Sequence, residues 1–169
     1  SKAEKANFLP DHVAARSIWV DGDNSLWIGT SGQYLYHYKD KKLTHYSDSN
    51  GLLHNHVHAL WKDKKGNLWI GTGNGVHRMK DDGKISNFKY ASGFCNDYIG
   101  SITEDRYGNM WFGTDRCLVR FNGNEYKSFS QEDGLASSTI YSLITDNKGN
   151  VWVGTNKGID RLETTESGE

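Results

Sequence analysis

The chain has 169 residues, enough for one ordinary domain that buries a hydrophobic core of its own. Its twenty basic and twenty-one acidic residues leave a formal net charge of −1, and no long run of one sign occurs. This balance argues against nucleic acid as a partner. No apolar run is long enough to cross a membrane, so we expect no membrane contact from this chain.

Residues 1–8 form a polar leader without the alternation of a strand. From residue 9 on, the sequence repeats itself. The motif Trp-Ile-Gly-Thr, or a close variant, begins at four tryptophans that are 42, 42 and 41 residues apart: Trp27, Trp69, Trp111 and Trp152. Four copies at a nearly constant period predict a repeat architecture.

Each copy divides into four short segments with the residue pattern of β-strands. The first segments are 16–20, 57–61, 99–103 and 140–144, and the second are 26–28, 68–70, 110–112 and 151–153. The third are 35–38, 76–79, 118–121 and 159–162, and the fourth are 43–46, 85–88 and 126–129. Such a group of four antiparallel strands is typical of one blade of a β-propeller. The prediction is an all-β protein of four propeller blades.

The blades are expected at 9–46, 52–88, 94–129 and 135–162, followed by a tail at 163–169. The fourth blade lacks a segment equivalent to the outer strand, because the chain there reads Ser-Gly-Glu. An array of four blades with one strand missing exposes the apolar faces of its first and last sheets. We therefore expect further blades or a second copy of the chain to complete the propeller and to cover 151–153.

The recurring tryptophan lies inside a three-residue apolar strand, which predicts that all four occupy equivalent buried positions between blades. An aspartate precedes each tryptophan by six residues, and a glycine precedes the last three by three residues. This pair is typical of a tight hairpin that an aspartate caps, with Asn24 replacing the glycine in the first copy. The four aspartates are Asp21, Asp63, Asp105 and Asp146.

Two further sets of residues have a structural interpretation. Arg78, Arg120 and Arg161 each follow their tryptophan by nine residues, and we expect them to form ion pairs with the turn aspartates between blades. Cys95 and Cys117 make neither a dense disulfide framework nor a closely spaced zinc pair. We expect two reduced, half-buried thiols.

The second and fourth copies, D-K-K-G-N-L-W-I-G-T-G-N-G-V-H-R and D-N-K-G-N-V-W-V-G-T-N-K-G-I-D-R, resemble the two-component regulator propeller repeat. A Gly-Leu or Gly-Phe pair eighteen residues before the tryptophan of the last three copies completes the pattern, and the resemblance extends over about 9–162. It implies a periplasmic or otherwise extracytoplasmic sensor domain of a bacterial hybrid two-component regulator. Such sensors typically recognise glycans and their breakdown products, so the implied partner is an oligosaccharide.

The candidate ligand-binding residues lie in the loops that lead from the outer strand of one blade to the inner strand of the next. In propellers such loops gather near the axis on one face, and polar or aromatic side chains recur there without a packing reason. The candidates are His54, Asn55, His56, Asn96, Asp97, Tyr98, Ser137, Ser138 and Thr139.

His54, His56 and His58 alternate along one strand, an arrangement that can bind zinc. The corresponding residues of the other copies are not histidines, so we favour a site without a metal or cofactor. No local signature of nucleophilic or acid–base catalysis occurs, and no catalytic residue is assigned. The expected function is non-catalytic ligand sensing. The alternatives are a propeller enzyme, either a lyase or a glycan hydrolase, and a protein-interaction scaffold.

Overall fold

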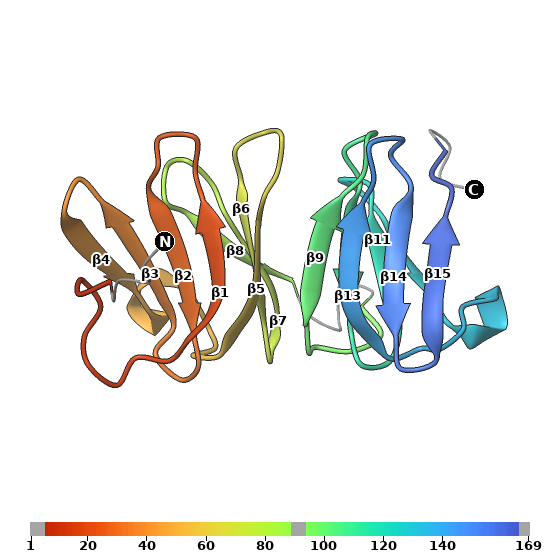
Figure 1. Ribbon diagram of the computed structural model, residues 1–169, viewed down its shortest axis with the longest axis horizontal. Helices are drawn as coiled ribbons and strands as arrows, with labels where there is room; N and C mark the ends of the chain where they lie inside the picture. Colours follow the sequence, from red (N-terminus) through yellow and green to blue (C-terminus); the bar gives the residue numbers. More distant parts are fainter. Residues whose placement is uncertain (1–5, 89–93, 166–169) are drawn as a thin grey trace, which may run out of the picture.

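The computed structural model describes residues 6–88 and 94–165, which fold into four antiparallel sheets (Figure 1). The first sheet contains β1 (Ala15–Val20), β2 (Leu26–Thr30), β3 (Leu35–Lys39) and β4 (Lys42–Tyr46). The second contains β5 (Val57–Lys62), β6 (Leu68–Thr72), β7 (Gly75–Met79) and β8 (Ile85–Phe88). The third contains β9 (Ser101–Glu104), β10 (Met110–Gly113), β11 (Leu118–Phe121) and β12 (Tyr126–Phe129). The fourth contains only β13 (Ile140–Thr145), β14 (Val151–Thr155) and β15 (Gly158–Leu162).

The prediction of four propeller blades is confirmed. In each blade the strands pair in chain order, and the sheets follow one another from one side of the molecule to the other (Figure 1). The inner strands are neighbours, with β1 beside β5, β5 beside β9 and β9 beside β13. Among the described residues, two short 3-10 helices, η1 (Asp48–Asn50) and η3 (Gln131–Asp133), follow outer strands. No helix among the described residues is long and apolar enough to cross a membrane.

The third inner strand begins two residues later than predicted, at Ser101 instead of Ile99. Ile99 instead makes a hydrogen bond between blades. The backbone N–H of Ile99 donates to the carbonyl of Thr72 in the second blade, at 2.9 Å, and Ile140 donates in the same way to Thr114 in the third blade, at 2.8 Å. Ile99 therefore contacts the second blade before its own strand begins, whereas Ile140 is the first residue of β13.

The hairpins between first and second strands follow the predicted aspartate pattern. Asp63 Oδ1 accepts the backbone N–H groups of Lys65 and Asn67, at 3.0 and 2.8 Å, while Gly66 takes a left-handed φ of +85°. The other oxygen, Oδ2, accepts the indole N–H of Trp69 at 2.8 Å. One carboxylate thus fixes both the turn and the tryptophan, a second role that the sequence did not indicate.

The first hairpin divides these roles between two aspartates. Asp23 accepts the backbone N–H of Ser25 at 3.0 Å, whereas Asp21 accepts the indole N–H of Trp27 at 3.1 Å. Asp21 also pairs with the Lys62 ammonium of the second blade, at 2.9 Å. Asn24 has a φ of +62°, as expected for the residue that replaces glycine.

Each of the three apolar cores lies between two blades. The tryptophan of one blade packs against the following blade, and Trp27, Trp69 and Trp111 are 8%, 2% and 3% exposed. The prediction of four equivalent buried tryptophans is wrong for Trp152, which is 38% exposed. Within the described residues, no sheet follows the fourth one to cover it.

The two end sheets expose opposite faces. We call the face of a sheet that turns toward the next blade its trailing face and the other its leading face. On the trailing face of the fourth sheet, Ile144 and Ile159 are 65% and 73% exposed. On the leading face of the first sheet, Ile18 is 62% exposed, while Phe8 stacks on the Tyr38 ring at 3.9 Å.

Two sequence expectations about these surfaces need correction. Val151 and Val153 need no further blade to cover them, because they are fully buried against the third blade. The arginines do not pair with the turn aspartates, whose oxygens already bind indole N–H groups. Arg78 lies 5.5 Å from the centre of the Trp69 ring, and Arg161 donates to Glu163 and lies 6.0 Å from the Trp152 ring. Among the described residues, no ion pair joins a turn aspartate to Arg78, Arg120 or Arg161.

Candidate functional site

The three predicted ligand loops precede β5, β9 and β13, so they lie at the same end of neighbouring inner strands. Several of their polar atoms are already occupied. Asn55 Nδ2 donates to the Gly32 carbonyl at 3.3 Å, and Asn96 Oδ1 accepts the Tyr98 N–H at 2.6 Å. Ser137 Oγ accepts the Thr139 N–H, and Ser138 Oγ accepts the Gln131 N–H. These four side chains hold the loops in place, which is a structural role. The backbone carbonyl of Asp97 also accepts a bond between loops, from the Gly75 N–H.

The ring side chains of the same loops lie in a row. Successive ring centres are 5.6 Å apart from His54 to His56, 6.3 Å from His56 to His58 and 4.8 Å from His58 to Tyr98. Burial, followed by the positive charge of Arg16, lowers the pKa of His58 to about 4, so this imidazole is neutral at pH 7. No three metal-binding side chains converge in the part of the chain that the structure describes.

A β-bulge recurs at one position of the inner strands. The pairing register skips the residue between Ala15 and Ser17 in β1, and it skips the equivalent residues in β5 and β13. Bulges redirect side chains and occur often beside active sites. The skipped residues are Arg16, His58 and Tyr141, and the equivalent residue of the third blade is Gly100.

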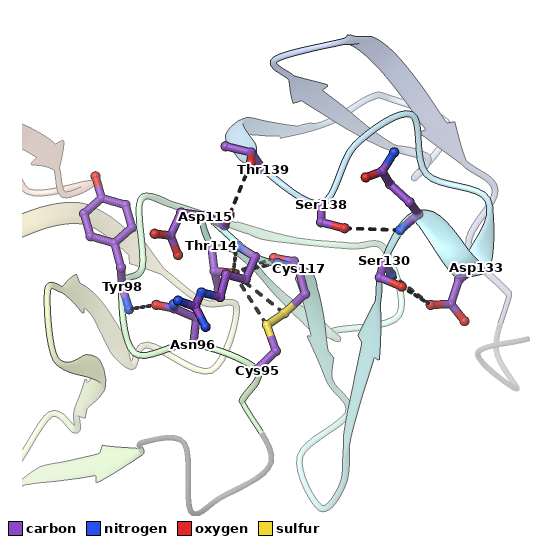
Figure 2. The surroundings of a disulfide bond; sticks show 12 residues. Cys95, Asn96, Tyr98, Thr114, Asp115, Cys117, Ser130, Asp133, Ser138 and Thr139 are labelled. Atoms are coloured by element: carbon purple, nitrogen blue, oxygen red, sulfur yellow. Dashed lines mark hydrogen bonds between the residues drawn. A yellow bond between two sulfur atoms is a disulfide. The ribbon is translucent and has the colours of Figure 1, made fainter.

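A cavity of about 400 Å³ lies beside these bulges. Two predicted site residues, Tyr98 and Thr139, line it, and the sequence analysis missed Arg16, Asp115 and Tyr141. Figure 2 shows Asp115 between Tyr98 and Thr139, whose hydroxyl donates to the Asp115 backbone carbonyl at 3.2 Å. The remaining lining residues are Gly100 and Ile140. One sequence signal could have identified the bulge position as part of a site. The inner strands repeat from blade to blade, but this position holds arginine, histidine, glycine and tyrosine in turn.

Gly100 gives Tyr98 its place. A Cβ atom at this position would lie 3.0 Å from the Tyr98 ring, which is closer than ordinary contact. With glycine there, the ring lies against the inner strand and contacts His58. Gly100 therefore positions an aromatic surface at the wall of the cavity.

A disulfide anchors the loop that carries Tyr98. Cys95 and Cys117 are bonded, with their Cα atoms 6.3 Å apart, so the expectation of two reduced thiols is wrong (Figure 2). The other blades use a hydrogen bond at this place. Leu53 N–H donates to His77 Nε2 at 3.1 Å in the second blade, and Ala136 N–H donates to Asp160 Oδ2 at 2.9 Å in the fourth.

The residue equivalent to His77 and Asp160 in the third blade is Val119, whose side chain has no acceptor. The covalent bond between Cys95 and Cys117 replaces the missing hydrogen bond. The sequence spacing gave no signal for this pairing, because the cysteines occur in one copy only.

Comparisons with known proteins agree with this architecture. Residues 51–74, 93–116 and 134–157 match the family model described as two component regulator propeller. No curated protein sequence matches the chain.

Similar solved structures show the same fold. The extracellular domain of a hybrid two-component system, BT3049 of B. thetaiotaomicron, has 22% identity and a TM-score of 0.80, covering 90% of this chain and 22% of that one. A catalytically inactive virginiamycin B lyase from Staphylococcus aureus, solved with quinupristin, has 19% identity and a TM-score of 0.77. The match covers 100% of this chain and 57% of the lyase chain. The extracellular domain of a one-component system, BT4673 of B. thetaiotaomicron, has 21% identity and a TM-score of 0.55, covering 96% and 29%.

These propellers extend beyond the four sheets described here, because this chain spans only 22% and 57% of the first two structures. Identities in this range establish a common fold and leave activity open. The match to the family model is more specific, since it recurs at the same position of three successive blades. Three of the four blades therefore match two-component regulator propeller repeats, and the chain folds as blades of a β-propeller.

Proposed function

We propose that this chain is a non-catalytic, ligand-sensing module of a bacterial two-component signalling receptor. The observation that carries the proposal is the match of three successive blades to the two-component regulator propeller. The disulfide supports a location outside the cytoplasm, in the periplasm or beyond it, because disulfides persist in oxidising compartments. The similarity to the extracellular domains of BT3049 and BT4673 supports the same location.

The ligand that we propose is a carbohydrate. Tyr98 and Tyr141 offer aromatic faces on which a sugar ring can stack, while Asp115 and Thr139 offer oxygen atoms to its hydroxyl groups. Tyr141 is 66% exposed, so burial in a core does not explain a tyrosine there. His54 and His56 extend the ring surface from Tyr98 and His58 along the second blade.

Calorimetric titration of the 169-residue chain with a panel of oligosaccharides tests this function. Replacing Tyr141 by alanine should weaken binding by at least tenfold, and Tyr98→Ala should have a similar effect. Tyr107→Ala is the matched control, because Tyr107 is also exposed but lies in a hairpin away from the cavity. Absence of binding to any saccharide, or equal weakening by all three variants, would contradict the proposal.

A lyase is the second candidate function. The specific observation in its favour is that the virginiamycin B lyase fold covers this chain completely. Mass spectrometry of quinupristin incubated with the chain is a direct test. A lyase opens the ring by elimination without adding water, so its linear product has the same mass and is recognised by its fragmentation pattern. Such a linear isomer would favour the lyase, and intact cyclic quinupristin would favour the non-catalytic module.

The partners that we propose for the end sheets are further blades of the same kind or a second copy of the chain. The exposed faces at Ile18 and Ile159 support this, because their equivalents between the described blades are buried or, for Leu143, partly buried. The repeat boundaries 9–46, 52–88, 94–129 and 135–162 are our proposal for the units that would join. Light scattering on the isolated chain distinguishes a monomer from a self-associated form.

A further inference from the structure

The cavity beside the bulges contains one positive and one negative side chain that do not neutralise each other. Arg16 comes from the bulge of the first blade, and Asp115 comes from the turn between β10 and β11 in the third blade. Within the described residues, neither the guanidinium nor the carboxylate has a hydrogen-bond or ion-pair partner. Two opposite charges thus face one cavity and remain available to a ligand.

The two charges require different groups of that ligand. A guanidinium offers a planar fork of N–H donors that matches a carboxylate and holds it by two parallel hydrogen bonds. An ionised aspartate only accepts, so it matches hydroxyl donors. A neutral sugar satisfies Asp115 but gives Arg16 no counter-charge.

The neighbours of Arg16 do not supply that counter-charge. His58, at the bulge of the next blade, is neutral at pH 7 because burial lowers its pKa to about 4. Arg16 therefore remains the positive side chain of the cavity.

We propose that this cavity binds a carbohydrate that carries a carboxylate, in the form of a uronic acid residue. Arg16 binds the carboxylate, Asp115 accepts from the ring hydroxyls, and Tyr141 stacks on the face of the sugar ring. This inference rests on the proposed function, since it names the class of saccharide that the sensing module recognises. Gly100 is its positioning residue, because it lets the Tyr98 ring lie against the cavity wall.

The test compares acids with their neutral counterparts. Oligosaccharides of glucuronic, galacturonic and mannuronic acid are titrated into the intact chain, each as the free acid and as the methyl ester. We expect at least one free acid to bind tenfold or more tightly than its ester, and its affinity to fall as sodium chloride is raised. Arg16→Gln should remove this preference, whereas Asp115→Asn should weaken acid and ester alike.

Arg116→Gln is the control, because Arg116 is adjacent to Asp115 in sequence but does not line the cavity. It should leave the preference unchanged. Melting temperatures of all variants establish that they fold, and Arg16 is exposed enough for its replacement to leave the core intact. Equal binding of acids and esters, or binding of neutral sugars alone, would overturn the uronic acid inference and leave the carbohydrate-sensing function standing. Failure of every saccharide, acidic or neutral, would overturn both.

Discussion

The second and fourth blades share their first three strands and the turns between them, but among the described residues only the second has a neighbour on its trailing face. Val76 in the second blade is fully buried, and its equivalent in the fourth, Ile159, is 73% exposed. Trp69 is 2% exposed, against 38% for Trp152. The turn aspartates nevertheless bind both indoles, at 2.8 and 2.9 Å. The hairpin geometry therefore forms within a single repeat. The apolar core forms only where the next blade covers the trailing face.

The tryptophan pair offers the most direct way to break this comparison. Trp69→Ala should lower the free energy of unfolding by about 3–5 kcal/mol, because it leaves a cavity between two blades. Trp152→Ala should cost only about 1 kcal/mol, since one side of that ring already faces water. Urea denaturation of the two variants measures both values. Equal losses would mean that the trailing face of the fourth blade is covered in solution.

The disulfide extends the comparison to the third blade, which replaces the hydrogen-bonded anchor of its neighbours by a covalent one. Removing it in the double variant Cys95→Ser/Cys117→Ser should cost about 3 kcal/mol, mainly by freeing the unfolded chain. Asp160→Ala, which removes the equivalent anchor of the fourth blade, should cost about 1 kcal/mol. Adding a reductant should destabilise the native chain and leave the double variant unchanged. A native chain that resists reductant would contradict this prediction only if thiol titration shows the bond to be open.

The turn aspartates should differ in the same direction as the tryptophans. Asp63→Ala leaves the buried Trp69 indole N–H without a partner and should cost about 2 kcal/mol. Asp146→Ala should lower the free energy of unfolding by clearly less than Asp63→Ala does, because the Trp152–Asp146 hydrogen bond is exposed to water. Thermal unfolding monitored by tryptophan fluorescence checks both. If Asp146→Ala proves as costly as Asp63→Ala, the carboxylate acts mainly on the hairpin and not on the ring.

The bulge position predicts a pH dependence for the second blade that the fourth blade lacks. The pKa of His58 is about 4 in the folded chain and near 6.5 when unfolded, so the unfolded chain binds the proton first as the pH falls. The contribution of neutral His58 to the free energy of unfolding is fully present above pH 6.5 and is lost as the pH falls from 6.5 to 4. His58→Asn should therefore flatten the decrease in unfolding free energy over that window, whereas Tyr141→Ala should not. Denaturation curves at pH 7, 5.5 and 4.5 provide the test, and parallel curves for the native chain and His58→Asn would refute it.

The smallest effect is expected on the exposed trailing face itself. Ile159→Lys should change the stability of the isolated chain by less than about 0.5 kcal/mol, because this side chain has no core to lose. It should reduce any self-association that light scattering detects in the native chain. A large loss of stability would show that the face is already covered.

The sequence was sufficient to predict the blades because their period, turns and apolar strands repeat. Every strand of the structure overlaps a predicted segment, and the hairpin role of Asp63, Asp105 and Asp146 is confirmed. The same reasoning failed for Trp152, since repetition in sequence does not imply repetition of surroundings. The end of a series has a neighbour on one side only.

The candidate site was predicted less well, because its residues are those that do not repeat. Tyr98 and Thr139 were found from the polarity of their loops, but Arg16 and Tyr141 were assigned to inner strands and passed over. Their exposure depends on a bulge, which is a property of strand pairing and leaves no mark in a single strand. The pairing of Cys95 with Cys117 depends equally on tertiary contact.

The direction built into the repeat has a consequence for assembly. Every described interface joins the trailing face of one sheet to the leading face of the next, so copies that repeat this interface meet through two different surfaces. Association of this kind is head-to-tail, and it ends only if the rotation from blade to blade closes a circle. Otherwise it continues as an open filament. The Phe8 ring, which covers part of the leading face through Tyr38, would then compete with each incoming Trp152 and so set how readily the chain polymerises.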